Sequence, residues 1–132
     1  MTTCLKENIP TDNRGINEDQ LVMTIFSQLG GKIYKKLARI HEIFYDIKHD
    51  SEFGQYLKHF EFDVMGITPF SDTLDQVISR LESSELLATS NPSYGTYTIN
   101  TEYMKREFNK LSPKDKEMVI KMSERFSELK AD

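Results

Sequence analysis

The sequence predicts an α+β fold that is mostly helical, with a winged helix-turn-helix-like core, a small β-hairpin and a long C-terminal helix. Three observations support this prediction. Apolar residues recur at helical spacing in several segments, most clearly in SDTLDQVISRLES. A strong turn signal, NPSYG, follows that helix, and the β-rich segment GTYTIN leads back from the turn. A helix, a strand, a tight turn and a second strand in this order are the layout of a winged helix-turn-helix.

The size and composition of the chain indicate one globular domain. It has 132 residues and a net charge of −4, which fits a single core and disfavours a general binder of polyanions. Its one cysteine, Cys4, excludes an internal disulfide and favours a reducing, cytoplasmic setting. No apolar run has the length of a signal peptide or a membrane span. We therefore expect a cytoplasmic protein that does not contact a membrane.

The N-terminal part of the chain predicts an arm and then a helix. Residues 1–15 are polar and are interrupted by Pro10 and Gly15, which indicates a flexible arm. Asn17 is a favourable N-cap for the helix that follows. Gly30-Gly31 is expected to end that helix. Its apolar face consists of Leu21, Val22, Ile25, Phe26 and Leu29.

A second helix and a short strand are expected next. The second helix is predicted from about Lys32 and ends near residue 50, with one apolar stripe: Ile33, Leu37, Ile40, Phe44 and Ile47. The segment FEFDV, residues 60–64, alternates apolar and acidic residues, as a half-buried strand does.

The recognition helix of the predicted fold begins after Ser71, which is a good N-cap. Its apolar face consists of Leu74, Val77, Ile78 and Leu81. The helix is expected to end at Ser83-Ser84, and an extended segment begins at Leu86-Leu87. Thr101 is expected to cap a short helix, and Ser112-Pro113 opens the last one.

Two regions are predicted after the arm: a winged-helix-like domain, residues 16–110, and the C-terminal helix, residues 111–132, as a candidate dimerisation element. This helix carries an apolar stripe: Met118, Met122, Phe126 and Leu129. The stripe fits two arrangements. It can lie on the domain core, or it can pair with the same helix of a second copy, since two-fold dimers are the commonest assembly and methionines suit an adaptable interface. We expect a homodimer.

The chain contains three motifs in succession: KKLxxIHEIFY, FEFDV and ITPFSDTLDQVISRLESSELL. In these motifs it resembles the YwgA-like phage-associated proteins of bacteria and archaea and the related Panacea antitoxin-type domains. In those proteins a Lys-Leu-rich helix with an aromatic end precedes a Gly-Pro-Tyr-Ser turn, and a leucine-spaced helix then runs into a Gly-Leu-Ile strand. The matching positions, within residues 20–100, are Lys36-Leu37, Phe44-Tyr45, Pro69-Phe70-Ser71, Leu74, Leu81 and Leu86-Leu87. The resemblance implies a winged-helix core and antitoxin or adaptor work by protein contact, without a catalytic residue.

The charge of the recognition helix and hairpin favours a protein partner over DNA. A DNA-reading helix needs exposed donors for bases and cations for phosphates. Between His49 and Tyr103 there are two cations, Lys58 and Arg80, and nine carboxylates. This acidic surface opposes nucleic-acid binding. We therefore expect the chain to bind a protein through exposed positions of the helix and the tip of the wing: Asp72, Asp75, Gln76, Ser79, Arg80 and Tyr94.

The alternative function is a dimeric, DNA-binding transcriptional regulator. In that case Gln76, Ser79 and Arg80 would read bases. Phosphates would be held by a basic group near the start of the second helix: Lys32, Lys35, Lys36 and Arg39. A solvated helix surface of mixed charge explains the same basic residues.

No set of residues indicates an enzyme, a metal site or a cofactor. The histidines His41, His49 and His59 have carboxylates nearby, but His41-Glu42 lacks the second histidine four residues later that a zinc helix needs. A structural role is the alternative for these histidines. Ser71 fits an N-cap better than a nucleophile, because no nucleophile elbow surrounds it.

Overall fold

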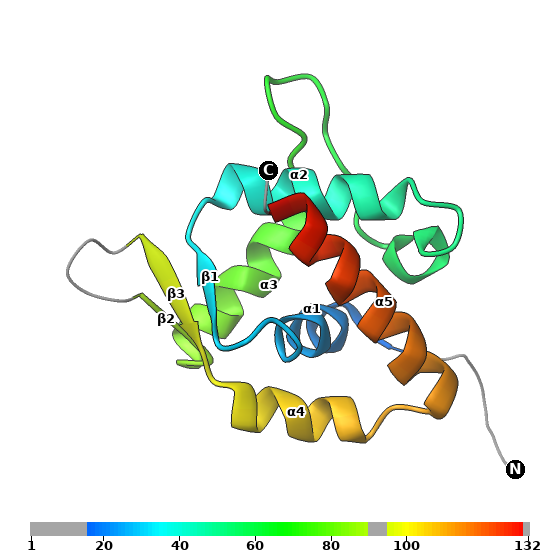
Figure 1. Cartoon of the computed structure of the whole chain (residues 1–132). Helices are drawn as coiled ribbons and strands as arrows, with labels where there is room; N and C mark the ends of the chain where they lie inside the picture. Colours follow the sequence, from blue (N-terminus) through cyan, green and yellow to red (C-terminus); the bar gives the residue numbers. More distant parts are fainter. Residues whose placement is uncertain (1–15, 90–94, 131–132) are drawn as a thin grey trace, which may run out of the picture.

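The computed structural model describes residues 16–89 and 95–130 (Figure 1). This part of the chain is an α+β fold, mostly helical, with a three-stranded antiparallel sheet, so the predicted fold class is confirmed at that level. The elements in chain order are α1 (Glu18–Phe26), β1 (Lys32–Tyr34), α2 (Leu37–Lys48), the 3-10 helix η1 (Gly54–Leu57), α3 (Asp72–Ser83), β2 (Leu87–Thr89), β3 (Thr96–Ile99), α4 (Thr101–Asn109) and α5 (Pro113–Lys130). The expected arm, residues 1–15, lies outside the described residues.

Helix α1 begins where its sequence predicts, but it ends at Phe26, before the predicted end at Gly30-Gly31. The side chain of Asn17 accepts a hydrogen bond of 2.8 Å from the backbone N–H of Gln20 and so caps the helix. Gly30 and Gly31 follow with φ of 81° and 95°. These are left-handed conformations that glycine adopts without steric cost, and they reverse the chain after the helix.

The segment after these glycines is a strand, so the prediction of a helix from Lys32 is wrong. Strand β1 pairs antiparallel with β3, and Ile33 lies opposite Tyr97. Ile33 is buried while both of its neighbours are exposed. Three residues are too few to show a period of two, and Ile33 also matches the helical stripe that continues at Leu37. Only the pairing with β3, 64 positions later in the chain, separates the two possibilities.

Helix α3 and the hairpin follow the prediction closely. Ser71 accepts the N–H of Leu74 at 3.2 Å, and all four predicted apolar positions of the helix are buried. The helix ends with the N–H of Leu86 donating to the carbonyl of Leu81 at 2.9 Å, while Glu85 adopts a φ of 63°. This is a Schellman-type ending, in which glycine is the usual residue. Strands β2 and β3 are antiparallel, and the sheet order is β1-β3-β2.

Residues 60–64 do not form the expected strand. Their only backbone pairing within the described residues is an isolated bridge between Asp63 and Phe70. Phe60 is buried, but Val64 is 54% exposed. Alternation alone cannot make a strand, because a strand needs a neighbour to satisfy its backbone groups, and here the chain pairs only with its own return. The result is a loop that projects from the body of the molecule next to α2 (Figure 1).

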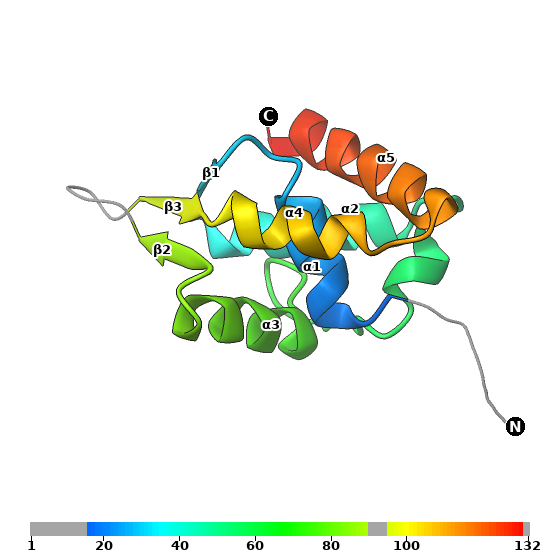
Figure 2. The same cartoon turned by 90° about the horizontal axis from the view of Figure 1, so that it is seen from below.

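Helix α5 is part of the core rather than a separate element. It packs on α1 and α2, and α1 lies between α3 and α5 (Figure 2). Met122 and Phe126 are at most 1% exposed, and Met118 and Leu129 are half-buried against the same core. The ring of Phe126 meets those of Phe26 and Phe44 at centroid distances of 6.0 and 5.7 Å. The expectation of dimerisation through this stripe is therefore corrected: the core of the same chain already covers it.

We expect Met122→Ala to lower the free energy of unfolding by about 2–5 kcal/mol, because it leaves a cavity between α5 and the core. Ile120→Ala is the matched control on the same helix. Its side chain is 41% exposed, and the change should stay within about 0.5 kcal/mol. Chemical denaturation at two protein concentrations measures both variants. A midpoint that rises with concentration and loses that dependence in Met122→Ala would instead favour the dimer contact.

We expect Glu85→Gly to raise the free energy of unfolding by about 0.5–1 kcal/mol. A left-handed backbone costs a residue with a Cβ about 1–2 kcal/mol, and the greater freedom of glycine in the unfolded chain offsets part of that gain. Glu85→Ala keeps the Cβ and should give no such increase. Equal stabilisation by both variants would show that the glutamate side chain, rather than the backbone conformation, is unfavourable here.

Candidate functional site

The outer face of α3 holds five of the six predicted partner-binding residues. The helix turns its apolar stripe to the core, which leaves Asp72, Gln76, Ser79 and Arg80 exposed and Asp75 half-buried. The sixth, Tyr94, lies outside the described residues. The helix lies along one side of the molecule, with α5 on the opposite side (Figure 2).

Arg80 is the one cationic side chain of α3, and it is already paired. Its Nη2 and Nε donate to the two carboxylate oxygens of Asp19, on α1, at 2.6 and 3.0 Å. These hydrogen bonds raise the pKa of Arg80. An exposed pair of this kind adds little stability, but it engages the Nε–H and one Nη2–H of the guanidinium, which are then not available to a base. The remaining charges on α3 are carboxylates.

An acidic and aromatic groove of about 370 Å³ borders the N-terminal end of α3. Its walls carry three carboxylates and two phenyl rings, together with Thr73: Glu61, Asp63, Asp72, Phe62 and Phe70. Asp63 and Phe70 exchange two backbone hydrogen bonds, of 2.7 and 3.0 Å, across the base of the projecting loop. The same two residues, Asp63 and Phe70, therefore line the groove and close the base of the loop.

A buried histidine holds one wall of this groove. The ring of His41 stacks on that of Phe70 at 4.5 Å, and its Nδ1 accepts the N–H of Ser71 at 3.1 Å. Because Nδ1 accepts, the neutral ring carries its proton on Nε2, which has no hydrogen-bond partner within residues 16–89 and 95–130. Burial lowers the pKa of His41, and Asp75 opposes this shift. The geometry gives His41 a structural role: it joins α2 to the start of α3.

The second ring of the groove is fixed from the opposite side. Phe62 meets the ring of Tyr45 edge-on at 5.4 Å, and the Nζ of Lys48 lies 5.8 Å from the centre of the Phe62 ring. The same Nζ donates to the carbonyl of Phe60 at 2.6 Å. Both aromatic walls are thus tied to α2, so the groove is held open without a ligand.

The loop above the groove has an apolar tip that the sequence pattern did not reveal. Met65 is 91% exposed, and Ile67 is as exposed as in an extended chain, at 105%. Figure 1 shows this loop projecting beyond the helices. The sequence around Gly66 predicts only a turn. The sequence feature that could have indicated this exposure is that Met65 and Ile67 belong to no periodic apolar pattern, so no helix or strand pattern assigns them to the core.

The four basic residues of the DNA hypothesis lie on β1 and around the start of α2 rather than on α3. Lys35 is half-buried and donates to Thr89 Oγ1 at 3.2 Å. Arg39 is paired with Glu42 and also donates to the carbonyl of Leu129. Lys32 and Lys36 are exposed. Lys36 lies over the ring of Tyr34, so three of the four have protein partners, and none of the four belongs to α3.

Residues 16–89 and 95–130 show neither a candidate metal-binding cluster nor a helix that could span a membrane. That part of the chain contains no group of three or more histidine, cysteine, aspartate or glutamate residues arranged to hold a metal ion. His49 and His59 are exposed and lie apart from the buried His41. No helix in the same part combines the length and the apolar character needed to cross a membrane.

No protein-family model, no curated protein and no solved structure matches this chain.

We expect stability to fall as the pH is lowered from about 6.5, the usual pKa of histidine, toward the lower pKa of folded His41. In this range the unfolded chain binds a proton that the folded chain does not, so the free energy of unfolding falls as the pH is lowered. His41→Asn offers Ser71 an acceptor that does not titrate. Its free energy of unfolding should depend less on pH between about pH 7.5 and 5. Denaturation curves across this range measure the slope, and equal slopes for both proteins would contradict the assignment.

Proposed function

We propose that this chain is a non-catalytic protein-binding module of antitoxin or adaptor type, with a winged-helix-like core, that recognises a basic partner. The order α1-β1-α2-α3-β2-β3 and the sheet order β1-β3-β2 support the winged-helix part of the proposal. The resemblance to the YwgA-like and Panacea proteins remains part of the proposal. The left-handed Glu85 is consistent with it, because that position corresponds to the glycine of the Gly-Leu-Ile strand motif.

The proposal rests on one surface that combines an acidic groove with exposed apolar side chains. The bridge between Asp63 and Phe70 joins the acidic groove to the loop that exposes Met65 and Ile67. Large apolar side chains exposed beside a polar rim mark protein interaction sites. Carboxylates in the adjoining groove favour a partner that brings cations and repel the phosphates of nucleic acid.

The groove also indicates which side chain of the partner would enter it. An arginine can pair with the carboxylates of Asp63 and Asp72 while its plane lies on the ring of Phe70. Both aromatic walls are already fixed through α2, so little freedom is lost on binding. The partner is then a protein segment with arginine next to apolar residues, which meet Met65 and Ile67.

The DNA-binding regulator remains the second candidate, because the order of helices and strands is also that of DNA-binding winged helices. A two-pronged base contact through Nε and Nη2 of Arg80 would require this side chain to leave Asp19. A gel-shift titration on random duplex at low salt tests it, and tight binding with a steep salt dependence would favour this candidate over the first.

We expect the double change Asp63→Lys and Asp72→Lys to weaken the capture of arginine-containing peptides on an array at least about tenfold. Both carboxylates line the groove, and the loss of a close charge pair costs this much or more. Capture by the unchanged chain should also fall with salt. Glu102→Lys and Glu124→Lys place the same charge change on exposed positions of α4 and α5, away from the groove, and should bind as the unchanged chain does. Equal capture by both double variants would refute the proposed site.

A further inference from the structure

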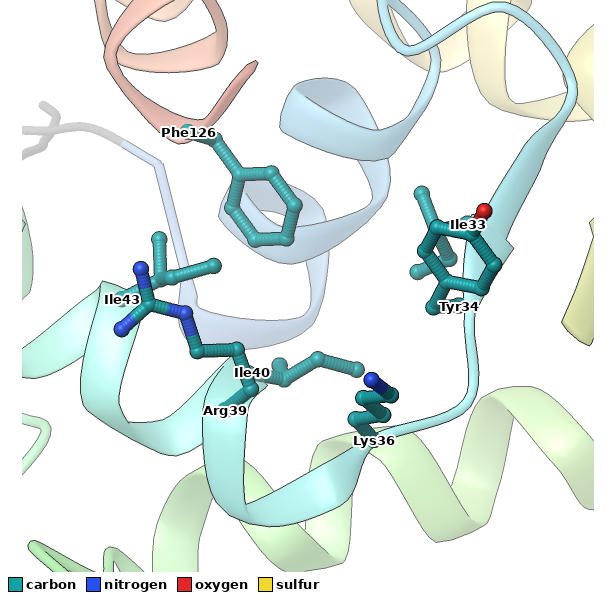
Figure 3. Close-up of a pocket in the computed structure, with 7 residues that line it drawn as sticks. All are labelled: Ile33, Tyr34, Lys36, Arg39, Ile40, Ile43 and Phe126. Atoms are coloured by element: carbon teal, nitrogen blue, oxygen red, sulfur yellow. The ribbon is translucent and has the colours of Figure 1, made fainter. Parts of the chain in front are cut away.

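A second pocket, of about 220 Å³, opens between β1, α2 and α5 (Figure 3). It shares no residue with the acidic groove. Its floor is made of four apolar side chains, each at most 4% exposed: Ile33, Ile40, Ile43 and Phe126. Its mouth is made of Tyr34, Lys36 and Arg39. Arg39 is paired with Glu42, so Lys36 supplies the positive charge of the mouth, and the pocket combines an apolar interior with a cation at its edge.

The volume limits what can enter. An apolar cavity of about 150 Å³ is enough to hold benzene, whereas pockets for drug-sized ligands and cofactors measure about 300–1,000 Å³. A volume of 220 Å³ thus admits one ring or a short branched chain with a small polar group. A nucleotide or a dinucleotide cofactor is too large.

The mouth favours an anion at the polar end of that ligand. The Nζ of Lys36 lies 5.8 Å from the centre of the Tyr34 ring, at the exposed edge of the pocket, whereas the side chain of Arg39 points away from Lys36 (Figure 3) and is paired with Glu42. Helix α2 also begins here without a side-chain cap and without an acidic residue in its first turn. Its partial positive charge adds to that of Lys36.

We propose that this pocket binds a small monocarboxylate with a compact apolar body. The body, a phenyl ring or a short branched chain, lies against Ile40 and Phe126. The carboxylate lies at Lys36 and the first turn of α2, where charge and hydrogen-bond donors meet. Such a ligand contacts β1, α2 and α5 together and leaves the acidic surface free.

The test is a titration of the isotope-labelled full chain with 3-phenylpropionate, followed by backbone amide signals. We expect shifts at Ile33, Tyr34 and Ala38, and binding about tenfold tighter than that of the neutral 3-phenylpropionamide, since one charge-assisted contact has this weight. Lys36→Gln should remove most of that preference. Lys32→Gln is the matched control: it removes an equally exposed cation of β1 that does not line the pocket.

Equal affinity for acid and amide, shifts confined to other residues, or no saturable shift would each overturn the proposal. An equal loss of affinity in Lys32→Gln and Lys36→Gln would overturn the role of Lys36, since it would indicate attraction by net charge alone. The double variant of Asp63 and Asp72 should bind 3-phenylpropionate normally, since neither residue lines this pocket. Failure of the peptide-binding function therefore leaves this inference standing, and the converse also holds.

Discussion

Four phenylalanine rings from distant parts of the chain pack together at the centre of the molecule and position the helices and the loop that carry them. Phe26 of α1, Phe44 of α2 and Phe126 of α5 lie within 6.3 Å of one another by ring centroids. Phe60, at the base of the projecting loop, stacks on Phe44 at 6.5 Å. Aromatic pairs at these distances add to the stabilisation that comes from burial alone. The cluster thereby joins three helices and the loop that borders the groove.

Both candidate sites depend on this cluster from opposite sides. Phe126 forms part of the floor of the small pocket, and Phe60 fixes the start of the segment that continues into the acidic groove. Helix α2 connects the two, because it supplies His41 to the wall of the groove and Ile40 to the floor of the pocket. The acidic groove and the pocket share no lining residue.

The elements that the sequence predicted well are those specified by neighbouring residues. Asn17 and Ser71 cap α1 and α3 through hydrogen bonds to residues three positions later. The apolar residues of α3 recur often enough at helical spacing to identify its buried face from the sequence alone. The exposed positions of that helix, and hence most of the candidate partner-binding residues, follow from the same periodicity.

Contacts between distant residues decided the rest. β1 is a strand because β3 lies beside it, although Ile33 fits a helical stripe equally well. The arginine expected to face a partner is held by Asp19, 61 positions away, and the C-terminal stripe is covered by α1 and α2. The sequence by itself determined the apolar face of α3, the caps at Asn17 and Ser71 and the acidic character of α3, because those properties depend on local spacing and composition. Only the tertiary structure decided which charges are paired, which apolar faces are covered and where pockets open, because these depend on segments that meet only after folding.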